Sequence, residues 1–540
     1  MLRVLICDKL ETSGRELLAQ AGIEVDYRPE LGKGGEELKA ALREADGAIV
    51  RSLPKVTAEY FENPGKLRAI ARAGVGIDNI DVAAATRKGI VVMNTPGGNS
   101  VSAAEHTIAL MLSMSRQIPA ADAVMKAGGW DRNKFLGSEV TGKTLGVIGL
   151  GRIGREVAKR AKGLEMRVLA FDPFVTPAKA AELGFEAVAS IDEMLSKVDY
   201  LTIHVPLTAE TKSLIGTREL GLMKKTARLM NVARGGIIDE QALADALKAG
   251  VVAGAAVDVF SKEPIAADNP LVKAPNIVLT PHLGASTLEA QENVAIEAAQ
   301  LMADFLLKGQ VANAVNMAAV NPTELAEVKP YVDLAYRLGL LHAQMDHGPI
   351  RKATLTYKGD LAAKKTKLLT AAFTAGLLES RVSGVNLVNA SILAGERGIE
   401  IAESTLHKKG DFASVMQAEV ETEKKSYTAA ATLFGDQYLR LVQLGQYRLE
   451  SYLDGTLFVF THLDLPGLIG FVGTIFGQHK TNIAAMTVGR QTPGGEAIGV
   501  LNLDGPPPEA AIAAVQTDPR ITSVSVVKLP PAGQLPPWLG

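Results

Sequence analysis

Cysteine is almost absent from this chain, since Cys7 is the only one among 540 residues. A single thiol forms no internal disulfide, which excludes a small disulfide-stapled secreted fold. Cys7 ends the apolar run 4–7, so we expect a packed strand residue in a reducing compartment. A reactive thiol is the open alternative.

Long apolar runs are also lacking. No stretch approaches the roughly 20 apolar residues that span a bilayer. Residues 1–8 carry charge too early for a secretory signal. We therefore expect a cytoplasmic protein without a membrane partner.

Neither sign of charge dominates, because 57 Lys and Arg residues stand against 59 Asp and Glu residues, a net charge of -2 at pH 7. This balance provides no field that would attract nucleic acid or anionic lipid, and we expect neither as a partner. Any small anion must be bound by a local cluster of cations. No metal site is expected.

The length exceeds what one hydrophobic core usually serves, so we expect three or four domains. In the first hundred residues, short apolar runs that read as buried strands alternate with amphipathic stretches such as 36–44. This alternation predicts a parallel sheet with crossover helices. The predicted strands are 4–7, 47–50, 69–71 and 90–93.

A second alternating series follows a long apolar helix predicted at 103–116. Six strands interleaved with helices are typical of a doubly wound nucleotide-binding domain. Because the helix at 103–116 is apolar on more than one face, we expect it to pack against a partner subunit. The predicted strands are 144–148, 167–171, 200–204, 228–232, 254–257 and 277–279.

A helix predicted at 287–308 leaves the second series and precedes a loop at 313–322. This helix could return to pack with the first unit, which would make the first domain discontinuous. Beyond about residue 325, strands predicted at 352–358 and 413–421 flank a helix at 362–379, while 384–390 is more polar than a core strand. No catalytic constellation is found in this region.

The last part of the chain predicts a βαββαβ order, which is that of a small ferredoxin-like module. The proline-rich tail at 529–540 is expected on the surface or disordered. The predicted strands are 456–463, 483–490, 496–503 and 521–527, with helices at 467–479 and 508–517.

A G-x-G-x-x-G turn at 149–154 lies between a predicted strand and a predicted helix, the context that makes this pattern informative. Gly149 permits the tight turn, Gly151 lets the backbone approach a pyrophosphate, and Gly154 lets the helix pack on the strand. Asp172 ends the next strand and would bind ribose hydroxyls and repel a 2′-phosphate, so we expect NAD rather than NADP. Plain turn-forming roles for the glycines and for Asp172 are the alternatives.

Arg234, Glu263 and His282 lie in loops near the ends of predicted strands, where open α/β sheets place ligands. Taken singly, they could be a surface salt bridge, a solvated loop charge and a satisfied polar residue. Together they predict hydride chemistry on a hydroxy acid. His282 would accept the hydroxyl proton, Glu263 would orient the imidazole and favour its protonated form, and Arg234 would anchor the carboxylate.

These loops and residues 71–81, Ala-Arg-Ala-Gly-Val-Gly-Ile-Asp-Asn-Ile-Asp, resemble the D-2-hydroxyacid dehydrogenase family over residues 1–310. The whole chain resembles the long form of the D-3-phosphoglycerate dehydrogenase family, in which an intervening domain and an ACT domain follow the catalytic pair. The resemblance implies NAD-dependent oxidation of 3-phospho-D-glycerate to 3-phosphohydroxypyruvate, the first step of phosphorylated L-serine biosynthesis.

The implied fold class is α/β, with two doubly wound parallel-sheet domains followed by an α+β intervening domain and a βαββαβ ferredoxin-like ACT domain. The predicted units are a discontinuous substrate-binding domain at 1–97 plus 285–312, a Rossmann domain at 98–284, an intervening domain of the allosteric substrate-binding type at 313–450, the ACT domain at 451–529 and the tail at 530–540.

The resemblance also implies roles for single residues. Arg51 would bind the phosphate of the substrate, joined by Arg132 from a neighbouring subunit. The other implied substrate residues are Gly74, Val75, Asn99 and Ser100, besides Arg234 and His282. The implied cofactor residues are Arg152 and Ile153 at the pyrophosphate, His204, Pro206 and Thr211 along the adenosine and ribose, and Ala233, Asp258 and Gly284 at the nicotinamide end, besides Arg234 and His282.

Residues 464–469, Asp-Leu-Pro-Gly-Leu-Ile, with Asn482 and Ile483, carry the resemblance to an ACT domain. Paired ACT domains bind an amino acid at their interface, which implies L-serine as an effector close to Gly467 and Asn482. A module used only for assembly is the alternative. With this second association surface, we expect a homotetramer.

Two other functions stay open at this stage. The first is another D-2-hydroxyacid dehydrogenase or 2-oxoacid reductase, acting on glyoxylate or 2-oxoglutarate, against which the two C-terminal domains and Arg51 count. The second is an NAD-sensing interaction protein on the same fold. The ACT-like module fits metabolic feedback better than that role.

Overall fold

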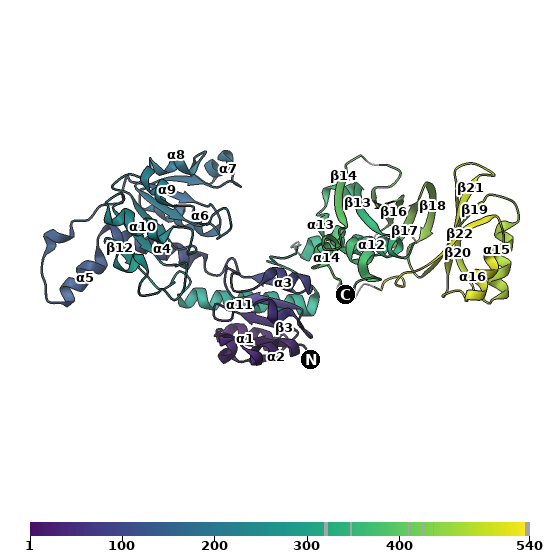
Figure 1. The fold of residues 1–540 in the computed structure, drawn as a ribbon, viewed down its shortest axis with the longest axis horizontal. Helices are drawn as coiled ribbons and strands as arrows, with labels where there is room; N and C mark the ends of the chain where they lie inside the picture. Colours follow the sequence, from purple (N-terminus) through teal and green to yellow (C-terminus); the bar gives the residue numbers. More distant parts are fainter. Residues whose placement is uncertain (318–321, 346–347, 409, 424, 436, 535–540) are drawn as a thin grey trace.

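The computed structural model describes residues 1–540 except 318–321, 346–347, 409, 424, 436 and 535–540. The described strands form four sheets, two of them parallel, one mixed and one antiparallel. In Figure 1 the two C-terminal sheets, green and yellow, lie on the side of the N-terminal unit away from the blue nucleotide-binding unit. The predicted fold class is confirmed.

The first sheet has five parallel strands in the order β2-β1-β3-β4-β5. The C-terminal part of α11 lies along this sheet, where Ala298 and Met302 share a core with Val4 and Ile49. The sequence analysis missed β2, because this edge strand is half polar and carries no apolar run. The elements are β1 (Arg3–Ile6), α1 (Thr12–Gln20), β2 (Glu24–Tyr27), α2 (Glu36–Glu44), β3 (Gly47–Val50), β4 (Ala69–Arg72), α3 (Val82–Arg87), β5 (Val91–Asn94) and α11 (Leu288–Lys308).

The second sheet has seven parallel strands in the order β12-β11-β10-β9-β6-β7-β8. The strand order reverses between β6 and β9, which is where doubly wound sheets bind ligands. Six strands were predicted, and the seventh is the two-residue edge strand β8. The strands are β6 (Thr144–Ile148), β7 (Arg167–Phe171), β8 (Glu186–Ala187), β9 (Tyr200–Ile203), β10 (Arg228–Asn231), β11 (Gly254–Val257) and β12 (Ile277–Leu279). The helices are α4 (Ser100–Ser115), α6 (Arg152–Gly163), α7 (Pro177–Glu182), α8 (Ile191–Leu195), α9 (Thr217–Leu222) and α10 (Glu240–Lys248).

An arm leaves this unit after α4. Helix α5 (Ile118–Lys126) has no buried residue and projects away from the sheet (Figure 1). The large apolar side chains Trp130 and Leu136 of the arm are 81% and 87% exposed. The arm therefore offers apolar surface that the chain does not cover itself.

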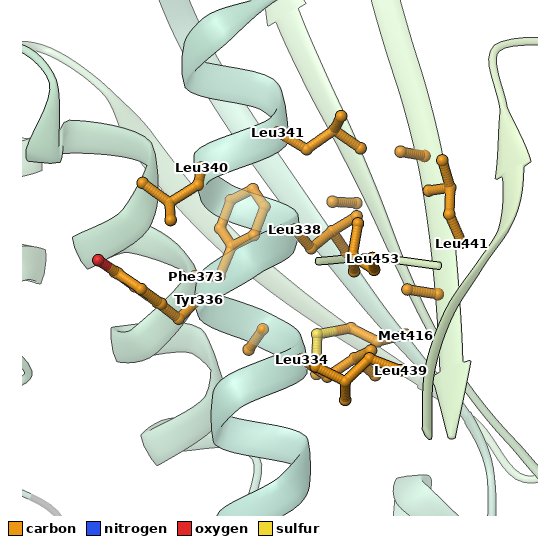
Figure 2. Close-up of a cluster of buried hydrophobic side chains, with 14 of the residues drawn as sticks. Leu334, Tyr336, Leu338, Leu340, Leu341, Phe373, Met416, Leu439, Leu441 and Leu453 are labelled. Atoms are coloured by element: carbon orange, nitrogen blue, oxygen red, sulfur yellow. The ribbon is translucent and has the colours of Figure 1, made fainter. Parts of the chain in front are cut away.

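The third sheet is mixed, with the order β14-β13-β15-β16-β17-β18 and only the β13–β14 pair parallel. Helix α12 lies against one face, where Leu334, Leu338 and Leu341 pack toward Met416 and neighbouring leucines (Figure 2). The sequence analysis predicted β13, β15 and α13 but not the remaining strands or α12. The elements are α12 (Pro322–Gln344), β13 (Ile350–Gly359), α13 (Lys367–Glu379), α14 (Ala390–Gly395), β14 (Glu400–Leu406), β15 (Ser414–Thr422), β16 (Ser426–Phe434), β17 (Tyr438–Leu444) and β18 (Tyr447–Tyr452).

The fourth sheet is antiparallel in the order β20-β21-β19-β22, and its chain order is the predicted βαββαβ. Two helices cover one face, while Val459, Val500 and Val527 on the other face join the core of the third sheet. The elements are β19 (Thr456–Leu463), α15 (Leu468–Gln478), β20 (Ile483–Arg490), β21 (Glu496–Leu503), α16 (Glu509–Val515) and β22 (Ile521–Lys528).

The start of the predicted tail is held by one buried side chain. The Arg337 guanidinium, which is not exposed, pairs with Asp333 at 2.7 Å and donates to the carbonyls of Pro530, Pro531 and Gln534. Residues 531–534 lie on the surface, as expected, but are fixed there. Residues 535–540, and the stretch 318–321 of the predicted loop at 313–322, lie outside the described part. The domain boundaries stay a prediction.

The structure also describes the surroundings of Cys7 and the lengths and side-chain clusters of the other described residues. Cys7 is fully buried, and burial, followed by the charge of Asp8, raises the pKa of its thiol to about 12. Among the described residues, no helix is both long and apolar enough to cross a membrane. The same residues contain no group of three or more side chains able to hold a metal ion.

Candidate active site

The glycine-rich turn follows β6 at the point where the strand order reverses. Gly149 has a φ of +94°, and a Cβ there would lie 2.6 Å from the His204 carbonyl oxygen. A Cβ on Gly154 would lie 2.0 Å from the Gly149 carbonyl oxygen, so helix α6 packs directly on the turn. A Cβ on Gly151 would meet nothing within 4 Å, which leaves its backbone open to a ligand. This geometry fits a pyrophosphate at the N-terminus of α6, which starts at Arg152 and Ile153.

Asp172 lies directly after β7, beside the glycine turn. Its carboxylate accepts the N–H of Leu150 at 2.8 Å and the N–H of Phe174 at 2.8 Å. The side chain therefore links the strand end to the turn. A carboxylate has further lone pairs for ribose hydroxyls.

The segment after β9 carries the residues implied for the adenosine side. Burial lowers the pKa of His204 to about 4, so its ring is neutral, with Nε2 2.9 Å from the Thr202 hydroxyl. The Thr211 hydroxyl donates to the Pro206 carbonyl at 2.6 Å and accepts the N–H of Thr208. This turn has a fixed backbone, and whether it binds the cofactor stays a prediction.

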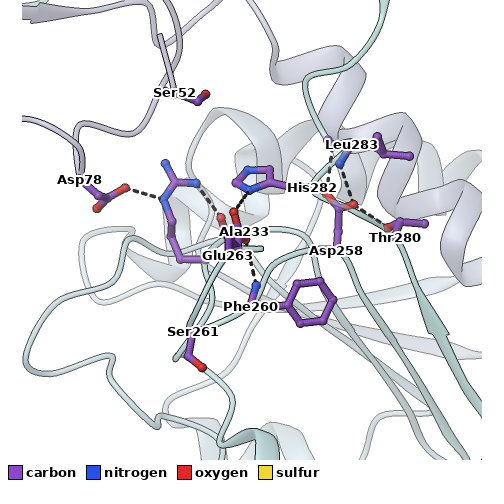
Figure 3. Close-up of polar contacts among 12 residues, drawn as sticks. Ser52, Asp78, Ala233, Asp258, Phe260, Ser261, Glu263, Thr280, His282 and Leu283 are labelled. Carbon is purple, nitrogen blue, oxygen red and sulfur yellow. Dashed lines mark hydrogen bonds and ion pairs between the residues drawn. The ribbon is translucent and has the colours of Figure 1, made fainter. Parts of the chain in front are cut away.

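Arg234 follows β10 and reaches across to the loop after β4. Its Nε lies 2.9 Å from an Asp78 carboxylate oxygen, and its Nη1 donates to the Ala233 carbonyl at 2.6 Å (Figure 3). Asn231 supports the turn, since its amide donates to the Arg234 carbonyl at 2.8 Å. A Cβ on Gly76 would lie 1.6 Å from Nη2 of Arg234, so only glycine admits this approach.

His282 and Glu263 are in direct contact. The imidazole Nδ1 lies 2.7 Å from a Glu263 carboxylate oxygen (Figure 3). Partial burial works to raise the pKa of Glu263, but hydrogen bonds from His282 and the Phe260 N–H, with the charge of His282, hold it below its ordinary value. The carboxylate is therefore ionised at neutral pH and faces Nδ1, which leaves Nε2 for another group.

Asp258, at the end of β11, is fully buried behind the His282 loop. Its carboxylate accepts the N–H groups of Leu283 at 2.8 Å and Gly284 at 2.9 Å and the Thr280 hydroxyl at 2.5 Å. Its bonds thus go to the loop on both sides of His282. The implied contact of Asp258 and Gly284 with the nicotinamide stays a prediction.

The implied substrate loops contain a cation that the sequence analysis missed. Burial, then the positive charges of Arg234 and Arg51, lowers the pKa of Arg72 to about 10. A Cβ on Gly74 would lie 1.9 Å from the Arg72 guanidinium. Arg72 ends β4 and directly follows the strand predicted at 69–71, and a cation at the end of a predicted strand is the signal by which it could have been found. The charges of Arg234 and Arg51 act against the charge of Arg72, and those of Asp78 and Asp8 partly offset them. A cluster of three guanidinium groups suits an anionic ligand.

The remaining implied substrate residues frame the same loops. The Val75 carbonyl accepts the Asn94 amide at 2.6 Å, and Ser100 is buried with its hydroxyl 3.2 Å from the Pro96 carbonyl. Buried polar atoms usually have a partner. Among the described residues, Arg72 Nε, Thr95 Oγ1, Asn99 Oδ1 and His204 Nδ1 are buried without one. Arg72, Thr95 and Asn99 belong to the implied substrate loops and His204 to the segment after β9, so a ligand at either place would meet polar atoms that still lack a partner.

Three implied residues lie outside this assembly. Arg132 is exposed at the end of the arm, next to α5. Gly467 caps α15 with a φ of +88° and an open Cβ direction, in the yellow unit of Figure 1. The Asn482 amide donates to Asp504 at 2.8 Å, and Asp464 pairs with Arg490 at 2.7 Å.

Comparison with known proteins decides the family. Residues 108–284 match the D-isomer specific 2-hydroxyacid dehydrogenase NAD binding domain, and residues 327–445 match the D-3-phosphoglycerate dehydrogenase intervening domain. A D-3-phosphoglycerate dehydrogenase of Methanocaldococcus jannaschii is 42% identical over 98% of this chain and 100% of its own length. The chain belongs to the D-3-phosphoglycerate dehydrogenase family. Another member, from Bacillus subtilis, is 40% identical over 98% of this chain and 100% of its own length.

Solved structures resemble the dehydrogenase part of this family. The TT0316 protein of Thermus thermophilus covers 58% of this chain and 100% of its own, with 34% identity and a TM-score of 0.53. A D-lactate dehydrogenase of Aquifex aeolicus, solved with NAD and lactic acid, covers 58% of this chain and 98% of its own, with 28% identity and a TM-score of 0.51. The predictions of the family and of NAD as cofactor are confirmed.

Proposed function

We propose that this protein oxidises 3-phospho-D-glycerate to 3-phosphohydroxypyruvate with NAD, as the first step of phosphorylated L-serine biosynthesis. The observation that carries the proposal is the 2.7 Å contact of His282 with Glu263, on the same unit as Arg234 and the glycine turn. A proton acceptor, its ionised partner and a cation for a carboxylate are what the oxidation of a hydroxy acid requires.

Each of the three side chains has one task in this reaction. Bound NAD, held by the glycine turn and Asp172, would supply the acceptor for the hydride of the hydroxyl-bearing carbon. His282 Nε2 takes the hydroxyl proton, and Glu263 stabilises the positive charge that develops on the ring. Arg234 binds the carboxylate of the substrate. In the free protein its Nε lies 2.9 Å from the Asp78 carboxylate, which supports the proposal that the guanidinium is placed to bind a carboxylate.

The phosphate selects the substrate. Arg51 and Arg72 come from neighbouring strands of the first sheet and are close enough for their charges to interact. A phosphate would relieve that repulsion, since it carries close to two negative charges at neutral pH. Arg132 of a second subunit would add a further cation, because the arm that carries it projects from its own domain.

The oligomer and the effector extend the proposal. The exposed apolar arm supports association through the nucleotide-binding unit, and the ACT domain supports a second interface, which together give a homotetramer. L-serine would bind near Gly467 and Asn482, where the Asn482 amide would exchange Asp504 for the carboxylate of the amino acid. The compartment is the cytoplasm.

NADH formation by the purified protein with 3-phosphoglycerate and NAD tests the function. Arg51→Gln should raise KM for 3-phosphoglycerate by roughly tenfold or more and leave KM for unphosphorylated glycerate unchanged, because a charged hydrogen bond is lost only with the phosphate. An enzyme that forms no NADH with 3-phosphoglycerate but reduces glyoxylate or 2-oxoglutarate would refute the proposal.

Serine titration of the tetramer tests the effector. Asn482→Ala should weaken inhibition by L-serine without changing kcat in its absence. An equal response of both proteins would remove the proposed effector site.

A further inference from the structure

The backbone of His282 is held in a strained conformation. Its φ is +56°, in the left-handed region that residues other than glycine seldom occupy. The His282 N–H donates to the Asp258 carbonyl at 2.9 Å and the Thr280 carbonyl at 3.0 Å. A conformation of this kind persists only when its surroundings fix it, so the groups that fix it control where the imidazole lies.

The Asp258 carboxylate is the centre of those surroundings. It accepts hydrogen bonds from the hydroxyl of Thr280, which precedes His282, and from the N–H groups of Leu283 and Gly284, which follow it (Figure 3). Because the carboxylate is fully buried, it needs strong donors to stay ionised. Burial works to raise the pKa of Asp258, but hydrogen bonds from His106, Thr280 and Leu283 outweigh it and keep the pKa below its ordinary value.

His106 is the one donor to this carboxylate, among the described residues, that does not belong to the loop. It comes from α4, and its Nε2 lies 3.1 Å from Asp258 Oδ1 and 3.2 Å from the Thr280 hydroxyl. The Thr280 proton is already donated to Asp258 at 2.5 Å. Both neighbours of Nε2 therefore offer lone pairs, so Nε2 must carry a hydrogen.

We propose that His106 is a positioning residue for the oxidation. By donating from Nε2 to Asp258 and Thr280, it fixes the loop that presents His282 to Glu263. This role rests on the proposed function, in which His282 accepts the substrate proton. It connects the chemistry to the middle of α4, a helix whose first residue, Ser100, is otherwise its one implied contact with the substrate.

Three variants separate this role from a packing role. His106→Leu removes the donor and should lower kcat by about tenfold or more, since small displacements of a catalytic group cost up to about a hundredfold. His106→Gln carries an amide N–H near the place of Nε2 and should keep kcat within about threefold of the wild type. Glu105→Gln is the matched control, because Glu105 is exposed on the same helix and pairs with Arg160 instead.

A cavity beside His106 permits a rescue experiment. A surface cavity of about 300 Å³ is lined by His106, Ser102, Leu283 and Thr287, among others. His106→Ala should therefore admit free imidazole, which should restore part of kcat in a saturable manner. Rescue of this kind follows from a missing donor and not from a general loss of stability.

A double variant locates the effect. In Glu263→Gln, the partner that orients His282 is already altered, so adding His106→Leu should lower kcat by less than it does in the wild type. A wild-type kcat in His106→Leu, with at most a lower Tm, would overturn the proposal, as would full additivity of the two changes. A wild type inactive on every acid tested would instead refute the proposed function, and the positioning role would fall with it.

Discussion

Gly76→Ala should impair the active site without unfolding the protein. The new Cβ would lie 1.6 Å from Nη2 of Arg234 and 2.9 Å from an Asp78 oxygen. Normal contact requires about 3.4 Å or more, so the guanidinium must retreat by about 2 Å. The displaced group is the end of a long side chain, and Tm should therefore change little. Since a misplacement of about 1 Å can cost about a hundredfold, kcat/KM for the substrate should fall by about that factor.

Steady-state kinetics with NADH absorbance checks this prediction, together with NAD binding by fluorescence. Gly163→Ala is the matched control, because a Cβ there, at the end of α6, meets nothing within 4 Å and should be neutral. Gly151→Ala should weaken NAD binding, because the open backbone of Gly151 faces the proposed pyrophosphate site. Gly76→Ala should leave NAD binding unchanged. Unchanged kcat/KM in Gly76→Ala, with wild-type Tm, would refute the placement of Arg234.

Three other changes have defined outcomes. In Glu263→Gln, His282 loses the carboxylate that lies 2.7 Å from its Nδ1 and orients the ring, so the maximum of kcat/KM for the oxidation should fall by about tenfold or more. A wild-type maximum would contradict the pairing. Asp172→Ala should make the enzyme less selective for NAD, because the repulsion of a 2′-phosphate is lost. The kcat/KM for NAD divided by the kcat/KM for NADP should fall by about tenfold, and an unchanged ratio would exclude the ribose role. Arg337→Met should destabilise the protein by about 3–5 kcal/mol in urea unfolding at neutral pH, because it leaves the buried Asp333 carboxylate without its partner. Burial raises the pKa of Asp333, so this loss should shrink as the pH falls and the carboxyl is protonated.

The sequence predicted the parallel sheets and the ACT-like unit well, because their local patterns agree with their tertiary environment. Each buried parallel strand is a short apolar run between turn residues, such as Gly254–Val257. The βαββαβ unit also has clear turns, and β19, β20 and β21 have the predicted limits. Strands at sheet edges were not predicted. Residues Glu24–Tyr27, for example, form a strand because they pair with β1 and not because they are apolar.

The third sheet was predicted only in part, because several of its elements form through contacts between residues that are distant in sequence. Strand β14 is largely exposed and is held by a parallel pairing with β13, which no alternation of apolar residues indicates. Helix α12 contains Pro330, a residue that argues against a helix unless packing compensates.

At the candidate site, the sequence predicted the groups to which we assign the chemistry but not the groups that hold them. Glu263 and His282 belong to recognisable loops, and the structure brings them to 2.7 Å. Asp78 and His106 were missed because their significance depends on neighbours that are distant in sequence, and Arg72 was missed because its place at a strand end was not weighed. Arg234 and Asp78, for example, are separated by 156 positions.

The sheet face that carries Val459, Val500 and Val527 has a practical consequence for dissecting this enzyme. Those valines sit among the leucines of the preceding unit rather than facing water. A chain cut just before β19 would remove those valines, expose the leucines that they cover, and lose the carbonyls that accept hydrogen bonds from Arg337. Such a fragment should aggregate, so the proposed effector role of Gly467 and Asn482 is better tested by point substitutions than by deleting β19 to β22.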